Sequence, residues 1–135
     1  MPNAFLDTNV IIYAATGKKN EPEKQAVAQR LLEEEDFGIS VQTLNEFYSN
    51  MRKPKFSMPI DTINQWIANL LEFDCTVVDT DIFFTASRLS ERFEIPYYDA
   101  ALLAAAKRHG AVIFFTEDLN HGQDYDGVQV INPFM

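Results

Sequence analysis

Residues 4–15 read AFLDTNVIIYAA, a short apolar run that ends in an acid and is followed by a helix-compatible run. Thr8 and Asn9 favour the start of a helix, because their side chains can accept hydrogen bonds from backbone N–H groups that lack a partner there. The stretch therefore predicts a strand, a turn and a helix, with Asp7 at the carboxyl end of the strand.

The same alternation of apolar runs and amphipathic segments continues along the chain. Apolar residues at three- and four-residue spacing predict helices, and brief apolar runs bounded by turn residues predict strands. The predicted helices cover residues 21–35, 41–53, 60–73, 82–93 and 97–110, and the predicted strands residues 37–40, 75–79, 111–116 and 128–131. Short apolar strands separated by helices favour an α/β fold, with a parallel sheet, helices on both faces and right-handed crossovers.

Length, composition and charge narrow the class of protein. The 135 residues, 47% of them hydrophobic, predict a single domain over residues 1–135. No apolar stretch approaches the roughly 20 residues of a membrane span, and the first residues lack the features of a secretory signal, so we expect a cytoplasmic protein. The net charge of -9 argues against a nucleic-acid binder held by electrostatics alone. It does not exclude a nuclease whose carboxylates hold Mg²⁺ or Mn²⁺, since the metal itself meets the phosphate.

Acids follow several of the predicted strands. Asp7 ends the first strand and Asp118 lies just past the apolar run at residues 111–116, so we expect both at one edge of the sheet. Ligands of open parallel sheets bind beyond that edge. Asp79 and Asp81 also follow a predicted strand, so the position at a strand end does not by itself select the functional acids.

Two further acids have unusually apolar neighbours. Glu46 lies inside a predicted helix beside Phe47 and Tyr48, and Asp99 precedes the run AALLAAA in the first turn of another. A charged group in such surroundings usually has a partner, and convergent carboxylates need a cation to offset their repulsion. Plain structural functions are equally compatible with single acids: Asp7 can cap its helix, and Asp99 can interact with its helix dipole.

The order and spacing of four segments resemble the PIN-domain nucleases. These segments are FLDTNVIIYA, the acid in NEFYSN, YYDAALLAAA and FFTEDLNHG, and the match runs from Asp7 to Pro133. The ending TEDLNHGQDYDGVQVINPF is similar to VapC-type toxins of prokaryotic toxin-antitoxin modules. The resemblance implies a three-layer α/β/α sandwich and endonucleolytic, metal-assisted hydrolysis of RNA with Mg²⁺ or Mn²⁺. It also implies a cognate antitoxin protein and a homodimer.

The resemblance also selects the site residues. The acidic set of the family, which serves as catalytic residues and metal ligands, falls on Asp7, Glu46, Asp99 and Asp118. Asn9 and Thr116 match positions that support the site, since both can orient carboxylates. Asp79 and Asp81 lie outside the set and become a strand end and a helix cap. Glu117 is predicted to point away from the site, because it is adjacent to Asp118.

Contacts to the RNA backbone are predicted for Arg52, Lys53 and Lys55, which form a basic patch in the break between two helices. A solvated loop explains these three side chains equally well. Two other functions are compatible with the residues: an aspartate-dependent phosphatase or phosphotransferase, and a PIN-like scaffold that binds RNA or a partner without cutting. Such phosphatases place a second Asp two residues after the first, where this chain has Asn9.

Overall fold

The computed structural model describes residues 3–17 and 20–135, which form a six-stranded sheet flanked by helices. The strands are β1 (Ala4–Leu6), β2 (Phe37–Ser40), β3 (Asp74–Thr76), β4 (Ile113–Phe115), β5 (Asp124–Tyr125) and β6 (Val128–Ile131). They lie in the order β3-β2-β1-β4-β6-β5. All neighbouring pairs are parallel except β5 with β6, so the expected parallel sheet is confirmed except for one short antiparallel edge.

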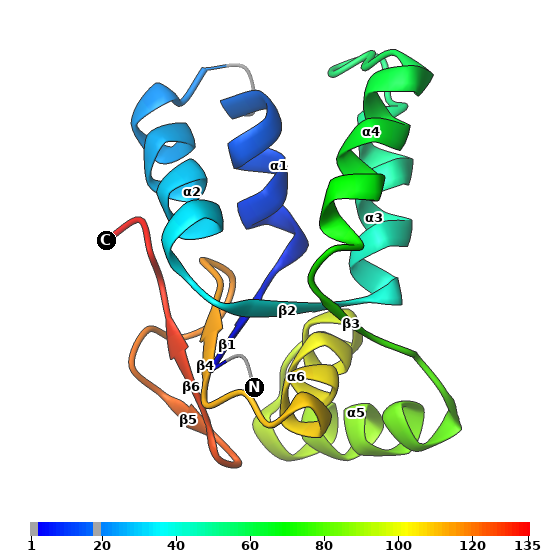
Figure 1. The fold of residues 1–135 in the computed structure, drawn as a ribbon. Coiled ribbons are helices and arrows are strands. Elements are labelled where there is room, and N and C mark those ends of the chain that lie inside the picture. The colour runs from blue at the N-terminus through cyan, green and yellow to red at the C-terminus, as the bar shows by residue number, and fades with distance from the viewer. Residues whose placement is uncertain (1–2, 18–19) are drawn as a thin grey trace.

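Helices cover both faces of the sheet (Figure 1). They are α1 (Thr8–Thr16), α2 (Pro22–Glu34), α3 (Val41–Met51), α4 (Ile60–Leu70), α5 (Thr80–Phe93) and α6 (Tyr97–His109). Side chains alternate along β1, so Leu6 packs with α1 to α4 whereas Phe5 packs with α5 and α6. The two apolar cores on opposite faces give the α/β/α layering that the sequence predicts.

Small side chains let α6 lie close to the sheet and to α5. Every residue of α6 from Ala100 to Ala106 is buried, and most of them are alanines. The helix ends at Gly110, whose φ of 81° is the left-handed conformation that glycine adopts without a steric penalty. The amino-terminal end of α6, which carries Asp99, is thereby fixed against the sheet edge where β1 ends.

The structure corrects several boundaries. The strand predicted at residues 75–79 ends at Thr76, because its pairing with the edge of β2 stops there. Val77 and Val78 are 67% and 44% exposed, so their apolar character does not reflect a buried strand. The sequence does not predict β5, because its two residues are too few to give an alternating pattern. Within residues 3–17 and 20–135, no helix is long and apolar enough to cross a membrane.

A close approach between β2 and α6 makes Gly38 necessary. A Cβ atom on Gly38 would lie 2.9 Å from Cδ2 of His109 and 3.2 Å from Cδ1 of Phe5. The His109 ring cannot move freely, since its Nδ1 lies 3.3 Å from the Thr76 hydroxyl. This contact sets how close α6 comes to the sheet.

We therefore expect Gly38→Ala to lower the free energy of unfolding by about 1–3 kcal/mol, the usual cost of overpacking. Urea denaturation measures this loss. In the double variant Gly38→Ala/His109→Ala the added methyl group has space, so the combined loss should be smaller than the sum of the two single losses. Additive losses would show that the contact with His109 is not the cause.

Candidate metal centre

Asp7 lies where β1 passes into α1, at the carboxyl edge of the sheet. Its backbone N–H donates to the Phe115 carbonyl of β4 at 3.0 Å, and its side chain accepts from the Asn9 N–H at the start of α1. Only 4% of Asp7 is exposed. Because Leu6 and Phe115 are register partners, the chain that follows β4 brings Asp118 to the same edge. The expectation that both acids share this edge is confirmed.

Three of the four predicted acids converge at one point. Asp7, Asp99 and Asp118 each offer a carboxylate oxygen, and these oxygens all lie within 4.8 Å of one another. In the part of the chain that the structure describes, this is the one group of three or more acidic, histidine or cysteine side chains with such spacing. The three acids come from the β1–α1 junction, the start of α6 and the loop after β4.

Glu46 lies beside this group rather than in it. It extends from α3, and its Oε1 accepts a hydrogen bond of 2.7 Å from the Thr8 hydroxyl. A second contact joins the same two regions, since the Gln42 side chain of α3 donates to the Tyr98 carbonyl, next to Asp99. The carboxylate of Glu46 is close enough to help raise the pKa of Asp99. The structure thus places Glu46 at the rim of the cluster.

The electrostatics of the cluster favour a cation. Burial, then the hydrogen bond and charge of Asp118, raise the pKa of Asp7 well above its ordinary value. Burial and the charges of Asp118 and Glu46 raise the pKa of Asp99 to about 6. Among the described residues, none of these four acids forms an ion pair with a basic side chain. Three uncompensated carboxylates at this spacing fit Mg²⁺ or Mn²⁺, which prefer oxygen ligands.

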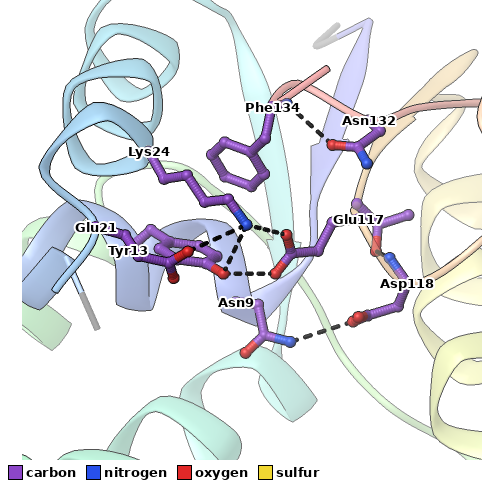
Figure 2. Close-up of polar contacts among 9 residues, drawn as sticks. Asn9, Tyr13, Glu21, Lys24, Glu117, Asp118, Asn132 and Phe134 are labelled. Carbon is purple, nitrogen blue, oxygen red and sulfur yellow. Dashed lines mark hydrogen bonds and ion pairs between the residues drawn. The ribbon is translucent and has the colours of Figure 1, made fainter. Parts of the chain in front are cut away.

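Both predicted supporting residues contact the carboxylates. The Thr116 hydroxyl donates to Oδ2 of Asp7 at 2.7 Å and accepts from the backbone N–H of Asp118 at 3.1 Å. The Asn9 amide donates to Oδ2 of Asp118 at 3.1 Å, as Figure 2 shows. These bonds orient two carboxylates that would otherwise repel each other.

Glu117 points away from the cluster, as its position beside Asp118 predicts (Figure 2). Its carboxylate accepts a hydrogen bond of 2.7 Å from the Tyr13 hydroxyl and one of 3.0 Å from the Lys24 ammonium. The Phe134 ring packs on the Tyr13 ring at 4.8 Å between centroids. Sequence reasoning missed this network, because no local pattern links residues that lie so far apart in the chain. Its effect is to neutralise a carboxylate next to the site.

The acids that the resemblance set aside have structural functions. Asp79 is the N-cap of α5, where it accepts from the Ile82 N–H at 3.0 Å, and it pairs with Arg108 at 2.7 Å. Asp81 lies in the first turn of that helix rather than at its cap. The prediction that Asp81 caps the helix and Asp79 merely ends a strand is therefore wrong, because the strand ends three residues before Asp79.

The three residues predicted to contact RNA do not share one surface in the structure. Arg52 turns back on α3, where its guanidinium donates to the Tyr48 hydroxyl at 3.0 Å. Lys53 and Lys55 instead line a hollow that also contains Asn9. The basic patch therefore approaches the carboxylate cluster through its two lysines.

One known protein family matches most of the chain. The family model described as the PIN domain matches residues 4–123. The chain belongs to the PIN domain family. A comparison with curated proteins finds no match.

Several solved structures are similar to this fold over most of its length. A toxin-antitoxin complex from Klebsiella pneumoniae is 22% identical with a TM-score of 0.70, covering 96% of this chain and 97% of that chain. DNA-bound VapBC from Salmonella typhimurium is 20% identical with a TM-score of 0.66 and the same coverages, 96% and 97%. Mycobacterium tuberculosis VapC20, described as a Sarcin-Ricin loop cleaving toxin, is 19% identical with a TM-score of 0.65, covering 85% and 91%. At these identities the likeness shows the PIN fold.

The raised pKa of Asp99 predicts a pH-dependent stability of the metal-free protein. The folded state binds more protons than the unfolded state between the ordinary pKa of 3.8 and about 6, so this carboxyl lowers stability as pH rises through that window. We expect Asp99→Asn to raise the free energy of unfolding at pH 7 by on the order of 1 kcal/mol, after allowing for solvent screening at a half-buried group.

Denaturant titrations at several pH values, with chelator present, measure this difference between the wild type and Asp99→Asn. Added Mn²⁺ should stabilise the wild type at pH 7 and leave Asp99→Asn nearly unchanged, because binding to the folded state alone shifts the unfolding equilibrium. Equal stabilisation of both proteins by Mn²⁺ would remove Asp99 from the metal centre.

Proposed function

We propose that this protein is a metal-dependent endoribonuclease that acts as the toxin of a toxin-antitoxin module. The observation that carries the proposal is the convergence of Asp7, Asp99 and Asp118 within 4.8 Å, at the carboxyl edge of the sheet and without a basic partner among the described residues. The negative charge of such a cluster attracts a divalent cation, and the bound cation in turn attracts the phosphodiester.

The side chains divide the work of hydrolysis. Asp7, Asp99 and Asp118 would hold the cation through carboxylate oxygens, and Thr116 and Asn9 keep two of these carboxylates oriented. When bound, Mg²⁺ or Mn²⁺ supplies Lewis-acid chemistry, acidifying water and neutralising charge on the phosphate. Glu46 is fixed by Thr8 at the rim, where its carboxylate orients water toward the phosphorus and accepts its proton.

Similar proteins support the proposed substrate and partner. VapC20 is described as cleaving the Sarcin-Ricin loop, which supports RNA as the substrate of this chain. Two other similar structures are toxin-antitoxin complexes, one of them bound to DNA, which supports a cognate antitoxin protein as partner. We also propose a cytoplasmic homodimer, for which exposed rings such as Phe84 and Tyr98, 61% and 68% exposed, provide apolar contact surface.

Asn in place of Asp7 removes a metal ligand but keeps the size and much of the hydrogen bonding of the side chain. Loss of an outer-shell partner alone costs about 10–100-fold in activity or metal affinity, so we expect Asp7→Asn to reduce Mn²⁺-stimulated RNA cleavage more than about 100-fold. Cleavage of a panel of structured RNAs, with and without chelator, measures the loss. Circular dichroism and thermal unfolding check that the variant stays folded.

The matched control is Asp81→Asn, which makes the same chemical change on an exposed residue of α5 outside the cluster. This variant should cleave RNA like the wild type. Full activity of Asp7→Asn would refute the assignment of the site. A folded wild type that binds Mn²⁺ and cuts none of the RNAs would favour the non-catalytic scaffold, and phosphorylation of Asp7 by acetyl phosphate would favour the phosphotransferase.

A further inference from the structure

A hollow of about 230 Å³ lies next to the metal centre and has no part in holding the cation. It is lined by Asn9 and Ile12 of α1, Asn50 of α3, and Lys53, Lys55 and Phe56 of the turn that follows α3. Asn9 belongs to both places, because its amide also donates to Asp118. The hollow therefore begins at the carboxylate cluster and leads to two lysines.

The charge of these two lysines is not neutralised within the described chain. Lys53 donates to the Asn50 side chain at 3.1 Å, and the Lys55 ammonium lies 5.3 Å from the centre of the Phe56 ring, but neither forms an ion pair with a carboxylate. In contrast, Lys24 and Lys107 are both paired with acids. In a protein with a net charge of -9, two adjacent unpaired ammonium groups are a marked local excess of positive charge.

The turn that carries the lysines is tied to α3 by backbone hydrogen bonds. The Ser57 N–H donates to the Lys53 carbonyl at 2.8 Å, and the Met58 N–H donates to the Met51 carbonyl at 3.0 Å. Met51 is fully buried, so this turn is anchored in the apolar core beside α1. The hollow is thus formed before any ligand arrives, which lowers the entropic cost of binding.

The walls of the hollow suit a phosphate group rather than a metal or an apolar ligand. Two ammonium groups attract an anion, and the Asn9 and Asn50 amides add hydrogen-bonding capacity. Ile12 and Phe56 form an apolar wall, which lowers the local dielectric constant and strengthens the attraction between lysine and phosphate. Arg52 is outside this set, because its guanidinium is held by Tyr48.

We infer that this hollow binds a backbone phosphate of the RNA strand next to the phosphodiester at the metal centre, with Lys53 and Lys55 as the phosphate ligands. The inference rests on the proposed ribonuclease function and adds a direction to it: the strand runs from the carboxylate cluster past Asn9 toward the turn after α3. The subsite contributes to RNA binding and not to the chemical step, since the lysines line a separate hollow and are not part of the carboxylate cluster.

The test compares Lys53→Gln/Lys55→Gln with Arg88→Gln/Arg30→Gln, which removes the same charge from exposed residues of α5 and α2. In steady-state cleavage of a single-stranded RNA with Mn²⁺, we expect the lysine variant to raise KM about tenfold or more and to leave kcat within about twofold, since phosphate contacts act in binding. The slope of log Kd against log salt should fall by about one per lysine. Lys53→Arg/Lys55→Arg should restore most of the affinity.

The same changes are also made in a Glu46→Gln background, which keeps the three clustered aspartates that hold Mn²⁺. Anisotropy of fluorescent RNA in the presence of Mn²⁺ then measures binding to the subsite separately from catalysis. Weaker binding of the lysine variant but not of the control supports the subsite even if the wild type cuts no RNA, an outcome that would refute only the ribonuclease proposal. Equal KM and salt dependence in the lysine variant and the control would overturn the subsite. A fall in kcat with unchanged KM, or no RNA binding by any form, would also overturn it.

Discussion

The parallel pairing of β1 with β4 holds two carboxylates together against their mutual repulsion. Asp7 and Asp118 follow strands that are in register, and the Asp7 N–H bonds the last residue of β4. Neither acid can leave without breaking backbone hydrogen bonds or the contacts of Thr116, which bonds both. The other elements complete this arrangement: the alanine-rich α6 brings in Asp99, and α3 brings Glu46 to the rim.

A site of this kind lowers the stability of the metal-free fold and raises the affinity for a cation. A buried carboxyl with a raised pKa makes the metal-free fold less stable at neutral pH, and that unfavourable energy is released when a divalent cation enters. The neighbouring network has the opposite character. Glu117 is paired with Lys24 and Tyr13, so a carboxylate adjacent in sequence to Asp118 is neutralised and turned away. The loop after β4 thus carries one carboxylate without a basic partner among the described residues, Asp118, and one whose charge is neutralised, Glu117.

The sequence predicts the parts of this structure that local patterns determine. Apolar runs and helical spacing predict the α/β order, and strand ends place Asp7 and Asp118 together. Asp99 and Glu46 are selected only by the family resemblance, because convergence depends on how helices pack onto the sheet. The contacts of Glu117 are out of reach for a different reason: its partners Tyr13 and Lys24 lie 104 and 93 residues away. Val77 and Val78 extend the predicted strand too far, since apolar residues just beyond an edge strand have the same pattern as the strand itself.

The distribution of charge explains how an acidic protein can accept an anionic polymer. Repulsion from a net charge of -9 acts over roughly a Debye length, about 8 Å at physiological salt, so only charges near the bound strand matter strongly. Near the centre, the three clustered acids are those that a cation would neutralise, and Glu117 is already paired with Lys24. Beyond Asn9, the next charged side chains are Lys53 and Lys55 of the turn after α3. Once a cation is bound, the path from the cluster to the turn after α3 carries positive charge that favours an RNA strand. If the chain acts as the proposed ribonuclease, its overall acidity contributes to specificity, because the cation and the two lysines offset the repulsion where the strand binds.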